Sequence, residues 1–199
     1  FMETPNIELM RMAKRSLKGN WGLAAGTFFV YILIISGIKF IPVIGSLALL
    51  IVGGPFALGI VIFSLSIARD QKAEFDQLFQ GFANFKKALG TYLLMVLFVL
   101  LWMLLLFVPG IIAAISYSMT FYILADDPSI GAMEAIKKSK EMMYGHKWKF
   151  FCLGLRFIGW ILLCCLTFGI GMFWLAPYMQ VSAAKFYEDV KGDLRRENV

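Results

Sequence analysis

Residues that could support catalysis are few and widely separated in this chain. The 199 residues include one histidine, His146, which lies between Gly145 and Lys147 without a carboxylate close to it in the sequence. The spacings typical of a zinc protease, a serine hydrolase or a phosphate-binding loop do not occur, and the three cysteines lack the spacing of metal ligands. We therefore expect no catalytic residue, no bound cofactor and no metal ligand, and we expect that the protein is not an enzyme.

One charged residue, Arg156, falls inside a predicted membrane span. It lies eight residues after Trp148, which corresponds to about 12 Å along an ideal helix. An arginine at the centre of a membrane costs roughly 2.5–3.5 kcal/mol before its side chain reaches toward the surface. Two interpretations stay open: Arg156 binds a lipid phosphate or an anionic substrate in a cavity, or it extends to the headgroups or pairs within the fold. The candidate lipid or anion contacts are Arg156, Lys149, Lys147, His146 and Trp148.

The composition places these residues in a membrane protein. Hydrophobic residues make up 60% of the chain and charged residues only 16%, whereas a soluble domain is about half apolar and about a quarter charged. Long apolar runs indicate six transmembrane helices arranged as three hairpins. These spans cover residues 21–38, 43–68, 92–107, 111–124, 148–166 and 170–187. The predicted fold class is therefore an all-α polytopic membrane protein.

An amphipathic segment precedes each predicted hairpin, at residues 7–18, 75–89 and 128–143. Apolar residues recur at helical spacing on one side of each segment, and charged residues cover the other side. The second segment carries the clearest stripe, and the third is predicted to begin with Asp127 as its N-cap and Pro128 as its first helical residue. We expect these helices to lie at the membrane surface. Their candidate interfacial residues are Phe75, Phe79, Phe82, Lys137 and Lys138.

The plan of surface helix and hairpin recurs three times within one membrane domain of residues 1–199. The repeat-like units are about 6–70, 75–127 and 129–189. Turns are expected at residues 39–42, 108–110 and 167–169, and the charged tail after residue 188 is expected to fray. Glycine and proline interrupt the second and sixth spans, where we predict helix kinks. The kink residues are Gly53, Gly54, Pro55 and Pro177.

The basic residues predict the orientation. Placing the three surface helices and the tail on one side gathers 17 of the 19 lysines and arginines there and leaves only Lys39 and Arg156. By the positive-inside rule this side is cytoplasmic, so both termini are predicted to lie in the cytoplasm. Basic residues confined to short segments between apolar runs are a sign of membrane topology and not of nucleic-acid binding. Anionic membrane lipids are the expected partners, with a second copy of the chain or another membrane protein as a further option.

Several strings of this sequence resemble a family of integral membrane proteins known as the domain of unknown function DUF975. They include LKGNWGL at residues 17–23, PGIIAAISYSM at 109–119, YILADDPSIGAMEAIKKSKEMM at 122–143 and GHKWKFF at 145–151. The resemblance covers nearly the whole chain and departs from the family pattern at Arg156. It implies a multi-pass protein of the bacterial cytoplasmic membrane, mostly in Gram-positive species, and it implies no activity. The chain is more distantly similar to the membrane domain of some glycerophosphodiester phosphodiesterases.

Two functions remain open from the sequence. The first is a non-enzymatic, lipid-interacting membrane protein that organises the bilayer or scaffolds partners. The second is a small transporter or lipid flippase, in which the kinked helices and Arg156 line a pathway. A cavity close to Arg156 would favour the second function, and a tightly packed core would favour the first.

Overall fold

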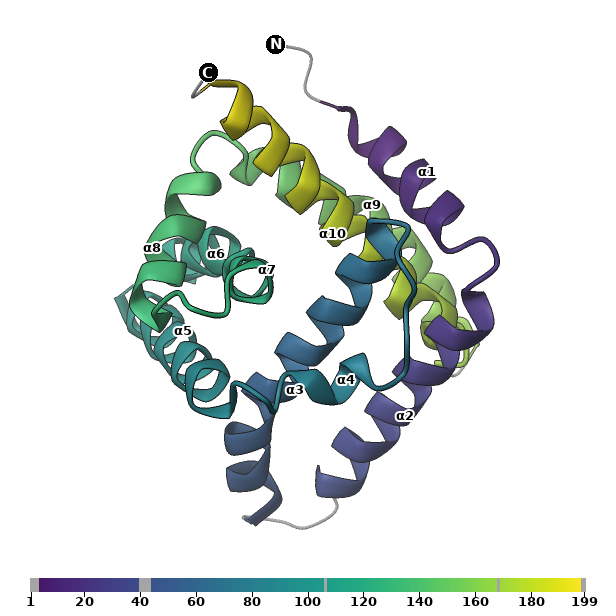
Figure 1. Cartoon of the computed structure of the whole chain (residues 1–199), viewed down its shortest axis with the longest axis horizontal. Coiled ribbons are helices and arrows are strands. Elements are labelled where there is room, and N and C mark those ends of the chain that lie inside the picture. Colours follow the sequence, from purple (N-terminus) through teal and green to yellow (C-terminus); the bar gives the residue numbers. More distant parts are fainter. Residues whose placement is uncertain (1–3, 40–43, 106, 168, 198–199) are drawn as a thin grey trace. The chain divides into compact units, whose positions relative to one another are not determined.

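The computed structural model describes residues 4–39, 44–105, 107–167 and 169–197, and every regular element in these ranges is an α-helix (Figure 1). The helices are α1 (Asn6–Ser16), α2 (Trp21–Lys39), α3 (Ile44–Ala68), α4 (Gln77–Gln80), α5 (Phe85–Leu105), α6 (Phe107–Tyr117), α7 (Thr120–Asp126), α8 (Ala132–Met142), α9 (Lys147–Leu166) and α10 (Met172–Glu197). The predicted all-α class is confirmed.

The chain divides into two compact units, which are described separately. The terminal unit comprises residues Phe1–Gly37, Phe63–Phe75 and Trp148–Val199, and the central unit comprises Ile38–Ile62 and Asp76–Lys147. The threefold division into repeat-like units stays a prediction.

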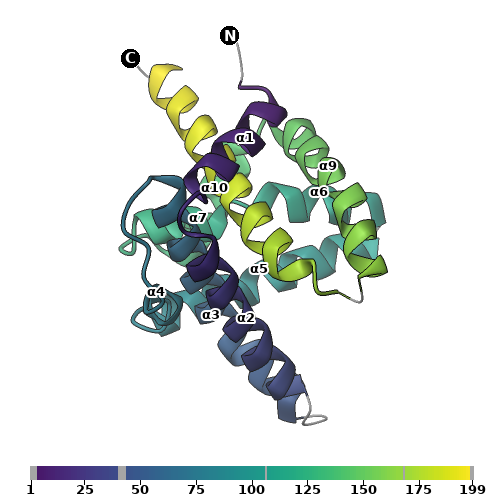
Figure 2. The ribbon, with the colours of Figure 1, turned by 90° about the vertical axis from the view of Figure 1, so that its right-hand side faces the viewer.

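In the terminal unit, α1 lies lengthwise against α10 (Figures 1 and 2). Leu9, Ala13 and Leu17, which are spaced four residues apart on one helical face, are buried. The Thr4 hydroxyl donates a hydrogen bond to the Asp189 carboxylate, and Lys14 lines the same pocket as Tyr178. Residue numbers therefore rise along α1 as they fall along α10, so the two helices are antiparallel. Protein side chains thus cover the apolar face of α1.

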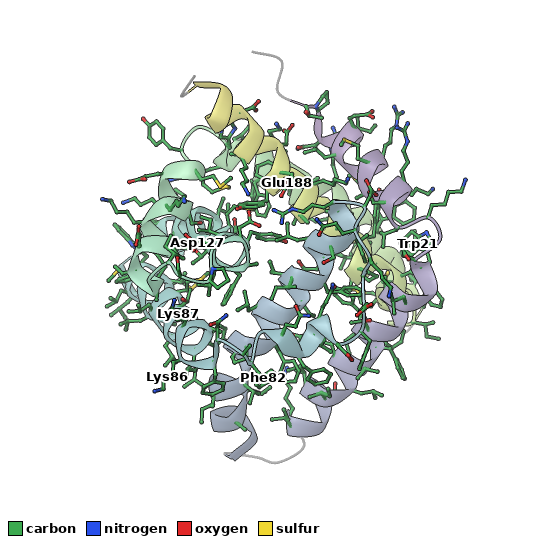
Figure 3. All side chains as sticks on the ribbon, viewed as in Figure 1. Trp21, Phe82, Lys86, Lys87, Asp127 and Glu188 are labelled. Atoms are coloured by element: carbon green, nitrogen blue, oxygen red, sulfur yellow. The ribbon has the colours of Figure 1, made fainter. Side chains whose placement is uncertain are left out.

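A cluster of hydrogen bonds and ion pairs joins four segments of the terminal unit, and we call it the polar layer. Arg69, just after α3, donates through Nε (2.9 Å) and Nη2 (2.6 Å) to Oε1 of Glu188 on α10 (Figure 3). Lys149 Nζ on α9 lies 2.9 Å from Asp189 Oδ2. The polar layer consists of Thr4, Asn6, Arg69, Asp70, Lys149, Lys185, Glu188 and Asp189.

A helix-ending motif places Asp70 in this layer. Asp70 has a φ of 54°. Its backbone N–H donates to the carbonyl of Ile67, and the N–H of Gln71 donates to the carbonyl of Ser66. This is the Schellman pattern, in which a left-handed residue ends a helix and satisfies its last carbonyls. The turn carries the Asp70 carboxylate to 3.8 Å from Lys185 Nζ.

In the central unit, α8 packs against α5, α6 and α7. Ala113, Tyr117 and Ile136 form a buried cluster there, against which Leu94, Met95, Phe98 and Val99 of α5 pack. The Ser139 hydroxyl of α8 donates to the backbone carbonyl of Ser116 at 2.8 Å. The apolar face of α8 is therefore covered by neighbouring helices of its own unit.

Small residues on α3 allow close backbone contacts in the central unit. A Cβ added to Gly59 would lie 1.9 Å from the Leu78 carbonyl oxygen, and one added to Gly54 would lie 2.6 Å from the Ala88 carbonyl oxygen. Phe56, between these glycines, packs edge-on against Phe82 with ring centroids 5.0 Å apart. Gly54 and Gly59 therefore allow close packing, and Gly54 belongs to the segment where the sequence predicts a kink.

Pro55 lies inside α3 and Pro177 inside α10, and the expected kinks at Gly53, Gly54, Pro55 and Pro177 stay predictions. The structure corrects other local expectations. Residues 108–110, expected as a turn, belong to α6, because a proline in a first helical turn forfeits no intrahelical hydrogen bond. The tail is helical as far as Glu197. The expected turn at residues 39–42 lies outside the described residues, apart from Lys39, which ends α2.

Two of the expected amphipathic helices also differ. The second is reduced to the four-residue α4, followed by turns that lead into α5 at Phe85. The third begins at Ala132 with Gly131 as its N-cap, so Asp127 does not cap it. Asp127 instead ends α7, and its Oδ1 accepts hydrogen bonds from Ser129 N (3.0 Å) and Ser129 Oγ (2.5 Å). The Asp127 side chain forms a local turn and does not initiate α8, because an aspartate readily accepts a hydrogen bond from the backbone N–H two residues later in the sequence.

Five helical stretches of the described chain have the length and composition to cross a membrane. They are Trp21–Lys39, Ala48–Ala68, Phe85–Leu104, Val108–Asp126 and Lys147–Leu166. The predicted sixth span, at residues 170–187, is not among them, because α10 carries charged residues through its second half. Only 17%, 11% and 17% of the apolar windows in the first, third and fifth stretches are buried. Contact with lipid acyl chains would cover these exposed apolar surfaces.

Candidate functional site

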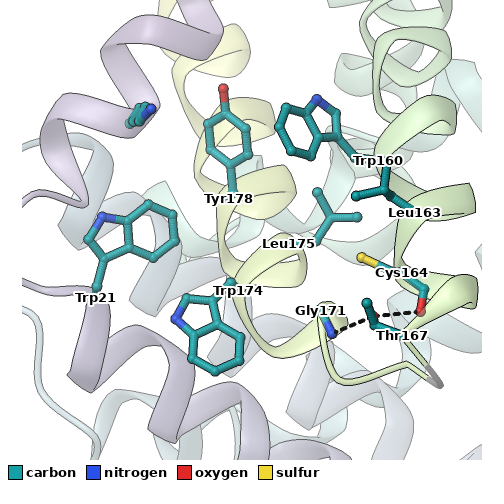
Figure 4. Close-up of a pocket in the computed structure, with 10 residues that line it drawn as sticks. Trp21, Trp160, Leu163, Cys164, Thr167, Gly171, Trp174, Leu175 and Tyr178 are labelled. Carbon is teal, nitrogen blue, oxygen red and sulfur yellow. Dashed lines mark hydrogen bonds between the residues drawn. The ribbon is translucent and has the colours of Figure 1, made fainter.

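The terminal unit contains a pocket of about 350 Å³, and four of its ten lining residues are aromatic. Three of its walls come from α2, α9 and α10, and α1 contributes a lysine (Figure 4). We call it the aromatic pocket. Its lining residues are Lys14, Trp21, Trp160, Leu163, Cys164, Thr167, Gly171, Trp174, Leu175 and Tyr178.

Helical spacing explains how the pocket forms. Trp160, Cys164 and Thr167 recur at intervals of four and three along one face of α9 and its end, and Trp174 and Tyr178 lie four apart on α10. A turn joins the two helices. Within it, Gly169 has a φ of +84°, which an L side chain rarely adopts. The Thr167 hydroxyl donates to the Cys164 carbonyl at 3.0 Å and accepts a hydrogen bond from the Gly171 N–H at 3.4 Å, which connects the end of α9 to the segment before α10.

Hydrogen-bond donors lie at both ends of the pocket. Figure 4 places Tyr178 and Trp160 toward one end, and Thr167, Gly171 and Trp174 toward the other. The phenol of Tyr178 and the indole N–H groups of Trp160 and Trp174 are hydrogen-bond donors. Lys14 is the one charged residue among the lining side chains. The pocket therefore joins an apolar interior to donors and a cation, an arrangement that suits an amphipathic anion.

Arg156 lies one helical turn before Trp160 on α9 and is exposed. Residues four apart share a helical face, so Arg156 stands beside the Trp160 end of the pocket, although it is not among the lining residues. Within the described part of the chain, neither Arg156 nor Lys14 has an ion-pair partner. The two cations are thus the ones that a ligand of this pocket would meet.

Lys149 occupies a different place from Arg156, although both belong to α9. Its side chain is 12% exposed and pairs with Asp189, whose side chain is 15% exposed. The ammonium also lies 5.7 Å from the ring centroid of Phe186, and the Lys149 carbonyl accepts a hydrogen bond from Asn6 Nδ2 at 2.8 Å. Lys149 is therefore engaged inside the polar layer, which weakens the expectation that it contacts a lipid anion.

The remaining candidate contacts do not gather around the pocket. Trp148 is 71% exposed and packs on Phe151 with ring centroids 5.5 Å apart. His146 and Lys147 belong to the central unit, where the His146 backbone N–H donates to the Met143 carbonyl at 3.2 Å. None of these three lines the aromatic pocket.

The candidate interfacial residues lie in three places. Phe79 and Phe82 flank Phe56 of α3, with Phe79 44% exposed. Phe75 belongs to the terminal unit, so the expected stripe is divided. Lys137 and Lys138 are exposed on α8.

Nearby, hydrogen bonds from Ser129 hold the pKa of the Asp127 carboxyl below its usual value, and the charge of Lys138 adds to this effect.

Sequence reasoning missed the pocket as a unit. It included Trp21 as the first residue of the predicted span at 21–38 and did not single out Trp174. The spacing of Trp160, Cys164 and Thr167 with Trp174 and Tyr178 across a glycine-containing turn was the available signal. Among the described residues, no group of three or more histidine, cysteine, aspartate or glutamate side chains is placed to hold a metal ion.

Within the described residues, these features define an all-helical protein with five helices suited by length and composition to cross a membrane. A family model with the description "Protein of unknown function (DUF975)" matches residues 2–116 and 103–193. The chain belongs to this family, which confirms the resemblance drawn from the sequence. No curated protein and no solved structure matches the chain. The distant likeness to membrane domains of glycerophosphodiester phosphodiesterases stays a prediction.

Proposed function

We propose that this chain is a non-enzymatic, multi-pass membrane protein that binds lipid and organises the bilayer or scaffolds partners. The observation that carries the proposal is the large apolar surface left uncovered on α2, α5 and α9, whose apolar windows are only 11–17% buried. In a bilayer, acyl chains would cover this surface. Each basic residue near an anionic leaflet adds on the order of 1 kcal/mol of attraction, so exposed residues such as Lys137 and Lys138 favour anionic lipid as the partner.

The proposed arrangement is six spans in three hairpins, with both termini in the cytoplasm of a bacterium. The polar layer supports placing the basic residues on one side of the membrane, because it contains Arg69, Lys149 and Lys185 from three separate parts of the sequence. It also supports a span in the first half of α10, since the charges that follow are paired with partners instead of facing lipid alone. In this arrangement α1 lies along α10, which agrees with the contacts between these two helices in the terminal unit.

Thermal stability in defined lipid tests this function. The full chain is reconstituted in nanodiscs of phosphatidylcholine alone and in nanodiscs containing phosphatidylglycerol, and the Tm is measured in each. A lipid that binds the folded protein raises the Tm by mass action, so we expect a higher Tm with phosphatidylglycerol. Equal Tm values in the two membranes would contradict preferential binding of anionic lipid.

A transporter or lipid flippase is the second candidate, and the aromatic pocket beside Arg156 is the observation that favours it. A bound amphiphile that moves along α9 would pass between the Trp160 and Thr167 ends of the pocket. Vesicles that contain fluorescent phospholipid in both leaflets, with dithionite added outside, measure this activity. Complete quenching in vesicles with the protein would support a flippase, and quenching of the outer leaflet alone would favour the scaffold.

A further inference from the structure

We infer that the aromatic pocket of the terminal unit is a binding site for one anionic phospholipid, with an acyl chain among the tryptophans and the phosphate at Lys14. This inference rests on the proposed function and names the lipid class and the site. The pocket volume of about 350 Å³ lies at the small end of ligand pockets, which are roughly 300–1,000 Å³. It therefore suits part of one acyl chain better than a whole lipid.

The lining favours a hydrocarbon guest. Beyond Lys14, the walls consist of three indoles, a phenol, two leucines and small residues, and Leu175 and Cys164 are buried. A chain that leaves lipid for this pocket keeps an apolar environment and gains contacts with rigid aromatic faces. Trp160 and Trp174 are 56% and 54% exposed, so the pocket is open along faces that a bilayer would cover.

Charge selects the headgroup. An aromatic pocket can also hold a quaternary ammonium group through cation–π contacts, but no acidic residue lines this one and Lys14 would repel a cation. Lys14 and Arg156 have no ion-pair partner within the described residues. A lipid phosphate at the Trp160 end of the pocket would accept hydrogen bonds from Lys14 and come within reach of Arg156.

The experiment measures lipid occupancy of the full chain by native mass spectrometry after purification in mild detergent and addition of phosphatidylglycerol or phosphatidylcholine. We expect the wild type to retain one phosphatidylglycerol and to bind phosphatidylcholine more weakly. Lys14→Gln removes the cation and is expected to weaken phosphatidylglycerol binding about tenfold, the effect of losing one charge-assisted hydrogen bond. Lys18→Gln removes the same charge from an exposed position outside the pocket and is expected to match the wild type.

A filling variant provides an independent test. Leu163→Trp places a larger side chain at the pocket wall and is expected to abolish retention of the lipid. A phosphatidylglycerol with a diazirine near the end of its acyl chain is expected to label wild-type Leu163, Cys164 or Leu175 upon illumination. If Leu163→Trp fails to fold, Lys14→Gln and the labelling pattern still decide the question.

The outcomes separate the site from the function. If phosphatidylglycerol raises the Tm of the protein but Lys14→Gln binds as tightly as Lys18→Gln and the label spreads over α2, α5 and α9, the pocket assignment is overturned and the lipid-binding function stands. If phosphatidylglycerol affects neither the Tm nor the occupancy, both are overturned. Labelling by a diazirine fatty acid at the same residues, without retention of phosphatidylglycerol, would replace the phospholipid with a free carboxylate amphiphile.

Discussion

Removing the Lys149 cation from the polar layer should destabilise the terminal unit. Lys149 Nζ lies 2.9 Å from Asp189 Oδ2, and their side chains are 12% and 15% exposed. Breaking a fully buried ion pair by removing one partner costs about 3–5 kcal/mol, because the other charge is left without compensation. Here the residual exposure and the Thr4 hydroxyl bound to Asp189 relieve part of that cost. We therefore expect Lys149→Met to lower the free energy of unfolding by about 2–4 kcal/mol.

The size of the effect depends on which partner remains. Asp189→Leu should cost a similar amount, because it removes the carboxylate that lies 2.9 Å from Lys149 Nζ and leaves this largely buried ammonium without its countercharge. The double variant should cost clearly less than the sum of the two single variants, since an apolar pair of similar volume replaces the ion pair. The coupling free energy from the double-mutant cycle should then reach about 1–3 kcal/mol.

The assay is reversible unfolding of the full chain in mixed micelles with increasing dodecyl sulfate, followed by far-ultraviolet circular dichroism. Lys72→Met is the matched control. It breaks the Lys72–Glu74 pair, which is shorter at 2.7 Å but has side chains 88% and 52% exposed. Exposed pairs contribute about 0–1 kcal/mol. If Lys149→Met costs no more than Lys72→Met and the coupling is zero, the polar layer does not hold the terminal unit together.

Three further predictions concern backbone geometry and pH. Gly59→Ala should cost about 3 kcal/mol or more, because its Cβ would lie 1.9 Å from the Leu78 carbonyl. Gly90→Ala, with no neighbour within 4 Å, should be neutral or stabilising in the same unfolding assay. Asp70→Gly relieves the strain of the left-handed conformation but also removes the carboxylate 3.8 Å from Lys185 Nζ. It should therefore destabilise less than Asp70→Val, which removes the same carboxylate and adds strain; equal losses of stability in the two variants would contradict this reasoning. Because hydrogen bonds from Ser129 lower the pKa of Asp127, their stabilisation is present above the ordinary aspartate pKa and is lost as the pH falls through the folded value. Tm measured from pH 6 to pH 3 should therefore fall more steeply in the wild type than in Ser129→Ala, and parallel curves would refute the assignment.

The sequence predicted the helical class and most of the membrane-length helices correctly, because apolar runs of sufficient length report directly on burial in lipid. One face of α1 and one face of α8 are buried, through Leu9 and Ala13 in α1 and Ala135 and Ile136 in α8. Periodicity says which face is apolar but not what covers it. In α1 and α8 the structure places protein there, whereas the sequence alone suggested the membrane surface.

Local competition explains the errors at the ends of elements. The phenylalanine stripe at residues 75–89 has helical spacing, but its helix is limited to four residues. Gly81 in this segment contacts the backbone of Pro55, where an added Cβ would lie 1.9 Å from the carbonyl oxygen. Asp127 and Pro128 resemble the start of a helix, yet the Asp127 side chain completes a turn with Ser129. In both places a tertiary or short-range contact is stronger than an intrinsic preference for helix.

The sequence by itself determined that this chain is helical, that it has long apolar runs and that its basic residues cluster in short segments. Composition and periodicity are enough to show these properties. Only the tertiary structure decided which of those residues form a site. It brought Lys14 and Trp21 to Trp160 and Trp174, across nearly the full length of the chain, and it paired Lys149 with Asp189 while leaving Arg156 exposed. Helical spacing assigns residues to faces of a helix, but the packing of one helix against another selects which faces meet.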